Sequence, residues 1–195
     1  SPKPQAPMPL DAPAVKRLAR DCGFDLCGIA PAEPFPELNR LTEWLASGFA
    51  GDMAWMVRTA GTRADPRLGL SSARSIVALG TLYNTGRPYS TEIADARQAL
   101  ISRYAWGEDY HLVIERRLDE LVARMRQAHG EAFEYRRYVD TGPVQERAVA
   151  ARAGLGWVGR NACLINPEQG SWFFLSVVLC NVPLAPDAPE VDHCG

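Results

Sequence analysis

Apolar side chains recur with helical spacing in several stretches of the sequence. The clearest stretch spans residues 109–128, where apolar positions share one face and charged residues cover the other. Residues 11–23 and 36–48 carry the same pattern between a residue suited to a helix start and a terminal glycine. Shorter helices are expected over 53–57 and 141–153.

Shorter apolar stretches predict strands. Residues 75–83 form a near-continuous apolar run, which is typical of a central strand, and residues 24–30 are short and apolar. Residues 133–139 alternate between apolar and polar side chains, as a half-exposed strand does. Residues 162–165 and 172–179 flank a turn-rich segment and predict an antiparallel hairpin. The expected class is therefore α+β, with a mixed sheet flanked by helices.

Length and composition indicate one folded domain. The 195 residues are enough for one buried core, and 47% hydrophobic with 23% charged residues argues against disorder. A formal net charge of -2 gives no overall basic field of the kind that attracts nucleic acid. No apolar run approaches the roughly 20 residues of a membrane helix. Five cysteines without a secretory segment indicate a reducing, cytoplasmic setting rather than a disulfide scaffold.

The two ends of the chain differ in character from its middle. Residues 1–10 are rich in proline and are expected to be a mobile tail or a remnant of processing. Residues 11–185 hold the predicted helices and strands and form the expected domain. Residues 186–195 follow spaced prolines and end on Cys194-Gly195, so the sequence is expected to stop in the middle of a motif.

Gly154, Gly156 and Gly159 match the G-x-G-x-x-G pattern of dinucleotide-binding proteins. That pattern needs a strand before it and a helix after it. Here a predicted helix precedes the glycines and a predicted strand follows them. We therefore interpret Gly154 as a helix stop and the other two glycines as parts of a tight turn.

Asp140 lies where a predicted strand ends and a predicted helix begins. A carboxyl group at such a position can point into a cleft, where burial would raise its pKa towards that of a general acid. An aspartate that shapes a turn or caps a helix is the simpler interpretation of the same position. Position alone favours the structural role.

Residues 103–111 gather aromatic rings, charges and one of the three histidines into a short segment. Such a density suits a flat aromatic or macrocyclic ligand that is held by stacking and polar anchors. The structural alternative is that Asp109 caps the long helix, the aromatic rings pack beneath it, and His111 is a hydrogen-bonded histidine. The two interpretations are compatible.

Arg63 lies in a predicted loop with Asp65 and Arg67. It could anchor the amide or phosphate groups of a cofactor, although a solvated ion pair is the usual role of such a loop. Four cysteines read as small core residues, and none has zinc-ligand spacing. They are Cys22, Cys27, Cys163 and Cys180.

Several motifs together resemble those of one enzyme family. The most specific motifs are Arg103-Tyr104-Ala105-x-Gly107-x-Asp109-Tyr110-His111, Val139-Asp140-Thr141-Gly142-Pro143-Val144-x-Glu146-Arg147 and Ala153-Gly154-Leu155-Gly156-Trp157-Val158-Gly159-Arg160-Asn161. Together with the loop at Arg63 and the strand at 24–30, they resemble the amino-terminal, cobalamin-binding part of epoxyqueuosine reductase. The resemblance spans roughly residues 12 to 195 in the family's order.

The resemblance implies a fold like that of the flavin nitroreductases, with cobalamin in place of flavin. It implies that the epoxide of epoxyqueuosine, at the wobble position of tRNA, is reduced to the alkene of queuosine. The implied cofactors are cobalamin and two four-iron–four-sulfur clusters. The implied partners are tRNA carrying epoxyqueuosine and a reduced electron donor, and the full-length form is expected to be a monomer.

The resemblance also implies roles for single residues, at the positions of this sequence that match the motifs of the family. Asp140 matches the proton donor of the family, so its turn and catalytic interpretations can both hold. Cys194 matches the first cysteine of a ferredoxin-like iron–sulfur domain, of which residues 186–195 would be the start. The residues implied for cofactor binding are Arg63, Arg103, Tyr104, Asp109, Tyr110, His111, Asn161, Leu164 and Leu175.

One cysteine cannot hold a cluster that takes four ligands, so the chain by itself is expected to be inactive. Three other functions stay open on the sequence alone. The chain could be a non-catalytic cobalamin-binding domain, a flavin-dependent nitroreductase-like oxidoreductase, or a relative of the reductive dehalogenases.

Overall fold

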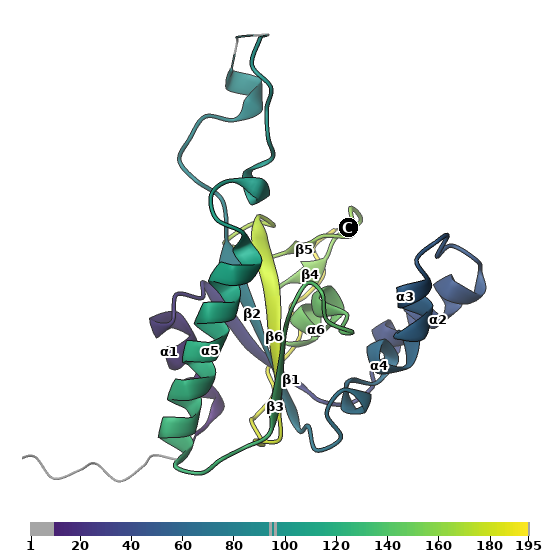
Figure 1. Cartoon of the computed structure of the whole chain (residues 1–195), viewed down its shortest axis with the longest axis vertical. Coiled ribbons are helices and arrows are strands. Elements are labelled where there is room, and N and C mark those ends of the chain that lie inside the picture. The colour runs from purple at the N-terminus through teal and green to yellow at the C-terminus, as the bar shows by residue number, and fades with distance from the viewer. Residues whose placement is uncertain (1–9, 94, 96, 195) are drawn as a thin grey trace, which may run out of the picture.

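The centre of the molecule is a four-stranded sheet (Figure 1). The computed structural model describes residues 10–93, 95 and 97–194. The strand order is β1-β2-β6-β3, and every pairing between these neighbours is antiparallel. The strands are β1 (Leu26–Pro31), β2 (Ser75–Leu82), β6 (Phe173–Cys180) and β3 (Tyr135–Val139).

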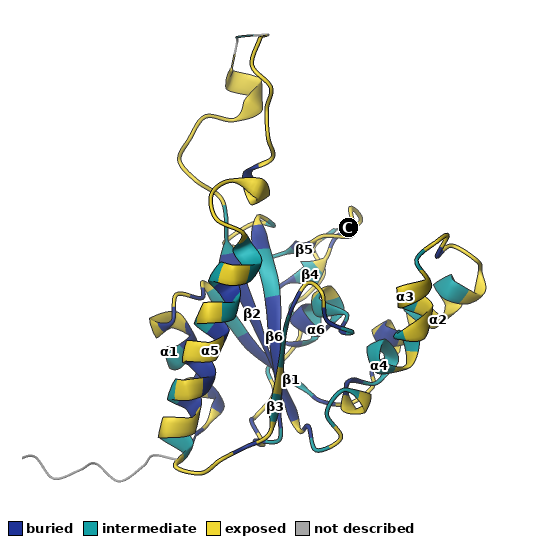
Figure 2. Ribbon diagram, viewed as in Figure 1, coloured by how far each residue is buried: buried dark blue, intermediate teal, exposed yellow. Residues whose placement is uncertain are grey.

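Helices cover both faces of this sheet and bury its two central strands. On one face, α1 (Ala12–Asp21) and α5 (Tyr110–His129) pack their apolar stripes against the sheet (Figure 1). On the other face, α6 (Glu146–Arg152) packs against residues of β1, β2 and β6. Figure 2 shows the sheet and the inner sides of these helices as buried. The predicted α+β class with flanking helices is confirmed.

Two segments extend away from the sheet. One is a helical arm, residues 36–68, with α2 (Pro36–Ala46), α3 (Ala54–Arg58), α4 (Ala60–Ala64) and the 3-10 turn η1 (Pro66–Leu68). The other is the connection from β2 to α5, whose described part contains η2 (Ser90–Glu92) and η3 (Arg103–Ala105). Both stand apart from the sheet in Figure 1 and are largely exposed in Figure 2.

The sheet differs from the expected mixed sheet for a topological reason. Strands β2 and β3 run in the same direction, and α5 lies between them in the chain. A helix between two strands in the chain commonly joins strands that are parallel neighbours in the sheet. Here β6 is inserted between β2 and β3 and runs opposite to both, so no two described neighbours are parallel.

The predicted hairpin of 162–165 with 172–179 is wrong. The short strand β5 (Leu164–Ile165) pairs with β4 (Trp157–Val158), whereas β6 pairs with β2 and β3. An isolated bridge between Asn166 and Gly170 is the remaining link across the turn. The apolar run of β6 is buried on both faces, so it belongs in the centre of the sheet rather than at an edge.

Two predicted boundaries also change. The loop expected at Arg63 is helical, because α4 and η1 follow each other there. The helix expected from residue 141 begins only at Glu146, because residues 140–145 form a loop that is held by side chains of the helical arm. The predicted starts and stops of α1 and α5 are confirmed, with Asp11 and Asp109 as side-chain caps.

The ends of the expected domain pack differently from the prediction. Residues 1–9 of the expected tail lie outside the described residues, and Leu10 is buried in the core. Near the other end, the Asp187 carboxylate accepts a 2.6 Å bond from Lys16 Nζ and a 2.8 Å bond from Ile29 N–H. Asp187, beyond the expected domain boundary at residue 185, therefore still contacts α1 and β1. No helix in the described part of the chain is long and apolar enough to cross a membrane.

The predicted core role of the cysteines is confirmed at three positions. Cys22 and Cys180 are buried, and burial raises the pKa of the Cys27 thiol to about 12, which leaves it protonated and inert. Cys163 is exposed, so its predicted core role is wrong. It lies in the bend before β5, outside the sheet strands that form the core.

We expect Gly28→Ala to destabilise the fold. Gly28 lies in β1, and a Cβ there would collide with the Ala153 carbonyl oxygen where α6 ends against the sheet. Forcing an extra methyl group into such a contact costs about 1–3 kcal/mol of unfolding free energy, which urea denaturation measures. Gly86→Ala, at an exposed site with no neighbour near the new Cβ, serves as the control. Equal midpoints for both variants would contradict close packing at Gly28.

Candidate functional site

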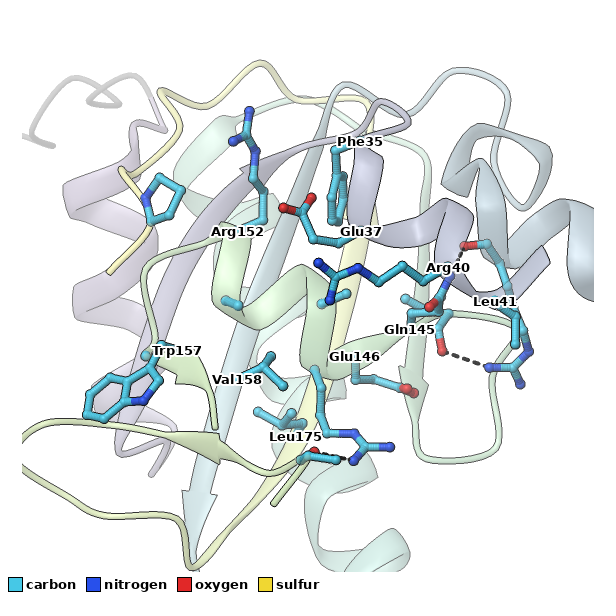
Figure 3. A pocket seen from close by; sticks show the side chains of 18 of the residues that line it. Phe35, Glu37, Arg40, Leu41, Gln145, Glu146, Arg152, Trp157, Val158 and Leu175 are labelled. Carbon is cyan, nitrogen blue, oxygen red and sulfur yellow. Dashed lines mark hydrogen bonds between the residues drawn. The ribbon is translucent and has the colours of Figure 1, made fainter. Parts of the chain in front are cut away.

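A cavity of about 980 Å³ lies between the helical arm, α6 and the end of β6. Its apolar wall includes Trp44 of α2. Phe35, which precedes α2, and Leu175 of β6 also line it (Figure 3). Arginines from α2, α4 and α6 reach the same cavity, which gives it both apolar surface and hydrogen-bond donors. Ligand sites typically combine a mostly apolar lining with a few polar groups, so this cavity has the character of one.

Asp140 lies at this cavity, immediately after the end of β3. Its backbone has a φ of 58°, in the left-handed region that few residues other than glycine adopt. Asp and Asn tolerate this conformation better than other side chains do. Its side chain is 66% exposed, and its Oδ2 accepts a 2.9 Å hydrogen bond from the Tyr110 hydroxyl. The turn that was predicted from the sequence thus presents a carboxyl group to the cavity.

Tyr110 and His111 position Asp140 from the first turn of α5. The Tyr110 ring stacks on Phe174 of β6 at 4.0 Å between centroids. Burial, with the Asp140 carboxylate as a further cause, raises the pKa of the Tyr110 hydroxyl above its usual value. The hydroxyl therefore stays protonated and donates to Asp140. His111 Nε2 lies 3.5 Å from the same Asp140 oxygen.

Arg63 holds the loop that carries Asp140. Its Nη1 and Nη2 each donate a 3.0 Å hydrogen bond, to the carbonyl oxygens of Val144 and Gly142 respectively. Its Nε donates to Thr59 Oγ1 at 3.0 Å. Gln145 adds a second link, because its Nε2 donates to the carbonyl oxygens of Leu38 and Arg63. Arg63 lines the cavity, and its Nε, Nη1 and Nη2 all donate to protein oxygens. Its predicted contact with a cofactor stays a prediction.

Glu146, at the start of α6, lines the cavity and was not singled out by itself in the sequence. Its Oε1 is buried and has no hydrogen-bond partner among the described residues. Burial raises the pKa of its carboxyl to about 7, while Arg63 acts in the opposite direction. A carboxyl group that is neutral near pH 7 can donate a hydrogen bond into the cavity.

We expect this carboxyl group to make stability depend on pH. Its pKa is about 7 when folded and near 4.5 when unfolded, so the folded protein binds more protons between these values. Stability is therefore greatest below the unfolded pKa and falls as pH rises through 7. Relative to Glu146→Gln, the wild type should lose up to about 3 kcal/mol from about pH 5 to about pH 8. Urea denaturation of both proteins at each pH measures the unfolding free energy. If the unfolding free energies of the two proteins changed in parallel with pH, the expectation would be contradicted.

The remaining predicted site residues do not all gather at the cavity. Leu175 lines it, and Leu164 is buried in the core cluster behind it. Asp109 caps α5, which confirms its structural interpretation. Asn161 shapes the turn before β5, where its Oδ1 accepts a 3.1 Å bond from Cys163 N–H.

Arg103 and Tyr104 lie in η3, outside the described lining of the cavity. The Arg103 guanidinium is buried and donates to Asn84 Oδ1 and to the carbonyl oxygens of Thr85, Arg87 and Pro88. It therefore organises the connection between β2 and α5, while Tyr104 is exposed. Their predicted contact with a cofactor stays a prediction.

Cys194 packs near the edge of the β4–β5 pair. The Trp157 indole N–H donates to its sulfur at 3.2 Å. No group of three or more His, Cys, Asp or Glu residues in the described chain is arranged to hold a metal ion. The role of Cys194 as a cluster ligand stays a prediction.

Three further arginines line the cavity and were not predicted as site residues from the sequence. Arg147 and Arg152 project from α6, and Arg40 projects from α2. Figure 3 shows the side chains of Arg40 and Arg152 among the lining residues. The helical spacing of Arg147 and Arg152 is visible in the sequence, but only the fold shows that α2 faces α6 across a cavity.

Comparison with known proteins identifies relatives of this chain. A family model described as "Epoxyqueuosine reductase QueG, DUF1730" matches residues 63–141, which include Arg63 and Asp140. An epoxyqueuosine reductase of Xanthomonas campestris pv. campestris is 41% identical over 194 residues, which is 97% of this chain and 54% of that protein. One of Synechocystis sp. is 44% identical over 171 residues, 86% of this chain and 57% of that protein. The predicted resemblance to epoxyqueuosine reductase is confirmed.

Solved structures give the same result for the fold. An epoxyqueuosine reductase crystallised with a tRNA-Tyr epoxyqueuosine-modified stem loop superposes with a TM-score of 0.78 at 31% identity, over 93% of this chain and 48% of that one. A reductive dehalogenase with a TM-score of 0.50 and 21% identity shares the fold alone. The chain spans about half the length of the epoxyqueuosine reductases that it matches.

Proposed function

We propose that this chain forms the acid-bearing part of an epoxyqueuosine reductase, and that the whole protein reduces the epoxide of epoxyqueuosine in tRNA to the alkene of queuosine. The observation that carries the proposal is Asp140, which is held in a left-handed turn at the cavity with only Oδ2 hydrogen-bonded among the described residues. The relatives that match this chain carry the name of that activity.

The reaction requires an acid at this place. Converting an epoxide into an alkene breaks both C–O bonds, takes up two electrons from a low-potential reductant and two protons, and releases water. The negative charge that develops on oxygen must be neutralised by a positioned proton donor. Asp140 is one of the carboxyl groups that line the cavity, and its Oδ1 accepts no hydrogen bond from any described residue.

The lining of the cavity suits cobalamin by its chemistry, and its volume is large. Its volume of about 980 Å³ lies at the upper end of ligand sites, which reach roughly 1,000 Å³. Apolar side chains suit the face of a corrin ring, and Arg40, Arg147 and Arg152 can donate to its amide side chains. The unpartnered Oε1 of Glu146 leaves a further polar group for a ligand. When bound, cobalamin supplies a low-valent cobalt that transfers electrons to the substrate.

Iron–sulfur clusters, tRNA and a cytoplasmic location complete the proposal. Clusters would relay electrons from the donor, and Cys194 would be one ligand of the four that each cluster requires. The structural relative solved with a modified tRNA stem loop supports tRNA as the partner. A tRNA substrate in turn supports a cytoplasmic location.

The proposal is tested by turnover. The protein is produced in the longest form that its gene encodes, and is incubated without oxygen with cobalamin, a low-potential reductant and tRNA carrying epoxyqueuosine. Mass spectrometry of the digested tRNA should show epoxyqueuosine replaced by queuosine, with the loss of one oxygen atom. Unchanged epoxyqueuosine in the presence of bound cobalamin and reduced clusters would contradict the proposal.

A further inference from the structure

Asp109, His111 and Asp140 form a continuous line of side chains at the start of α5. His111 Nδ1 lies 2.8 Å from Asp109 Oδ1, and His111 Nε2 lies 3.5 Å from Asp140 Oδ2. The Nε2 atom is buried and has no hydrogen-bond partner among the described residues. A buried polar atom without a partner is costly, so its presence in a native fold calls for an explanation.

The imidazole ring is held in one orientation. Asp109 accepts from the backbone N–H of His111 at 2.9 Å as well as facing its ring nitrogen, and the Tyr110 ring stacks on the imidazole at 4.0 Å between centroids. A carboxylate beside Nδ1 keeps a hydrogen on that nitrogen. Nε2 is therefore the nitrogen that gains and loses a proton, and it faces Asp140.

We propose that Asp140 and His111 together store the two protons that one turnover consumes, with His111 reloading Asp140 after the acid has donated its own. This inference rests on the proposed function. Reduction of an epoxide to an alkene and water takes up two electrons, from the low-potential reductant, and two protons. One carboxylic acid supplies one proton, so a second donor must act before product leaves.

The transfer is balanced at each atom. Asp140 gives its proton to the epoxide oxygen and becomes a carboxylate. The imidazolium of His111 then gives its Nε2 proton to Asp140 and becomes neutral, retaining the Nδ1 hydrogen that Asp109 accepts. Asp140 donates again, and the oxygen leaves as water. Once product has left, solvent reloads both groups, because the Asp140 side chain is 66% exposed.

The geometry suits a transfer that occurs in the loaded site. A separation of 3.5 Å is long for a hydrogen bond, but hydrogen bonds in catalytic sites commonly shorten when ligands bind. The titratable groups that contact His111 in the described structure are Asp109 at Nδ1, Asp140 at Nε2 and Tyr110 across the ring face. The Asp109 carboxylate at Nδ1 orients the ring so that Nε2 faces Asp140.

The first test is His111→Gln in the longest natural form of the protein. We expect kcat to fall about a hundredfold with little change in KM, because binding is retained and proton supply is lost. The wild type should lose activity on the alkaline side as His111 deprotonates, and this limb should be absent from the variant. Added imidazole should restore part of the rate. His129→Gln, at the other end of α5, is the matched control and should behave as wild type.

A second readout is independent of turnover. Nitrogen NMR of the His111 imidazole should show hydrogen on Nδ1 in the neutral form. Its titration midpoint should fall in Asp140→Asn, because the facing carboxylate is lost. A midpoint that is identical in both proteins would overturn the proposed pairing.

The outcomes separate this inference from the function on which it rests. Suppose that the wild type reduces epoxyqueuosine while His111→Gln keeps full kcat and the same loss of activity at alkaline pH. The proposed supply of a proton by His111 is then wrong, and the proposed function stands. If the wild type with its cofactors is inactive, the proposed function is wrong, whatever the NMR titration shows.

Discussion

Replacing Asp140 by Asn should abolish epoxide reduction while leaving the fold and the cavity intact. Loss of a general acid typically lowers kcat by about 10²–10⁴-fold, and an amide cannot supply the proton. Asn tolerates the left-handed backbone that Asp140 adopts, with its φ of 58°, so the loop should keep its shape. The cavity wall is unchanged in size, so cobalamin affinity should equal that of the wild type.

The comparison needs kcat and cobalamin binding to be measured on the same preparations. Asp52→Asn, on an exposed turn of the helical arm outside the cavity lining, is the control for the change of charge. We expect it to keep full activity and full affinity. Substantial reduction of epoxyqueuosine by Asp140→Asn would remove Asp140 as the acid.

The second large effect is expected at Arg63. Its guanidinium spans the carbonyl oxygens of Gly142 and Val144, and thereby fixes the loop that begins at Asp140. Hydrogen bonds from a charged group contribute about 1.5–3 kcal/mol each, so Arg63→Ala should release this loop from the arm. A displacement of about 1 Å at a catalytic group can cost a hundredfold in rate, and we expect a loss of that size.

Lysine at this position should not restore the function. A single ammonium group on a flexible chain cannot reproduce the planar fork that reaches both carbonyl oxygens. Arg63→Lys should therefore resemble Arg63→Ala, with faster proteolysis of residues 140–145 as the structural readout. Arg58→Ala, at an exposed position of α3, is the control. If Arg63→Lys kept wild-type activity and wild-type resistance to proteolysis, the loop would not depend on Arg63 for its conformation.

Local pattern was enough to predict most of the helices. The stripe of α5 is buried along its length, and its cap at Asp109 and stop at Gly130 follow ordinary helix chemistry. Strand pairing was harder, because it depends on contacts between distant segments. The run that became β6 was expected to pair with its sequence neighbour, yet burial on both faces placed it between β2 and β3.

In the candidate site too, features set by local sequence were predicted and features set by contacts between distant segments were not. The position of Asp140 at a strand end predicted its turn, whereas its catalytic role was implied only by the family resemblance; the structure places it at the cavity. For Arg63, the sequence favoured a solvated ion pair and the family resemblance implied a cofactor contact. Two of its partners are backbone carbonyls 79 and 81 positions away, which no local pattern shows. Glu146 drew no attention because only burial makes its carboxyl group unusual.

We expect the cavity beside Asp140 to bind cobalamin. Anaerobic titration of the longest natural form of the protein with cob(II)alamin, followed by electron paramagnetic resonance, tests it directly. We predict that the cobalt spectrum changes on binding and saturates at one cobalamin per chain. We also predict that Leu175→Trp, which fills the apolar wall, weakens this binding. A spectrum that stays that of free cob(II)alamin at saturating protein would contradict the account.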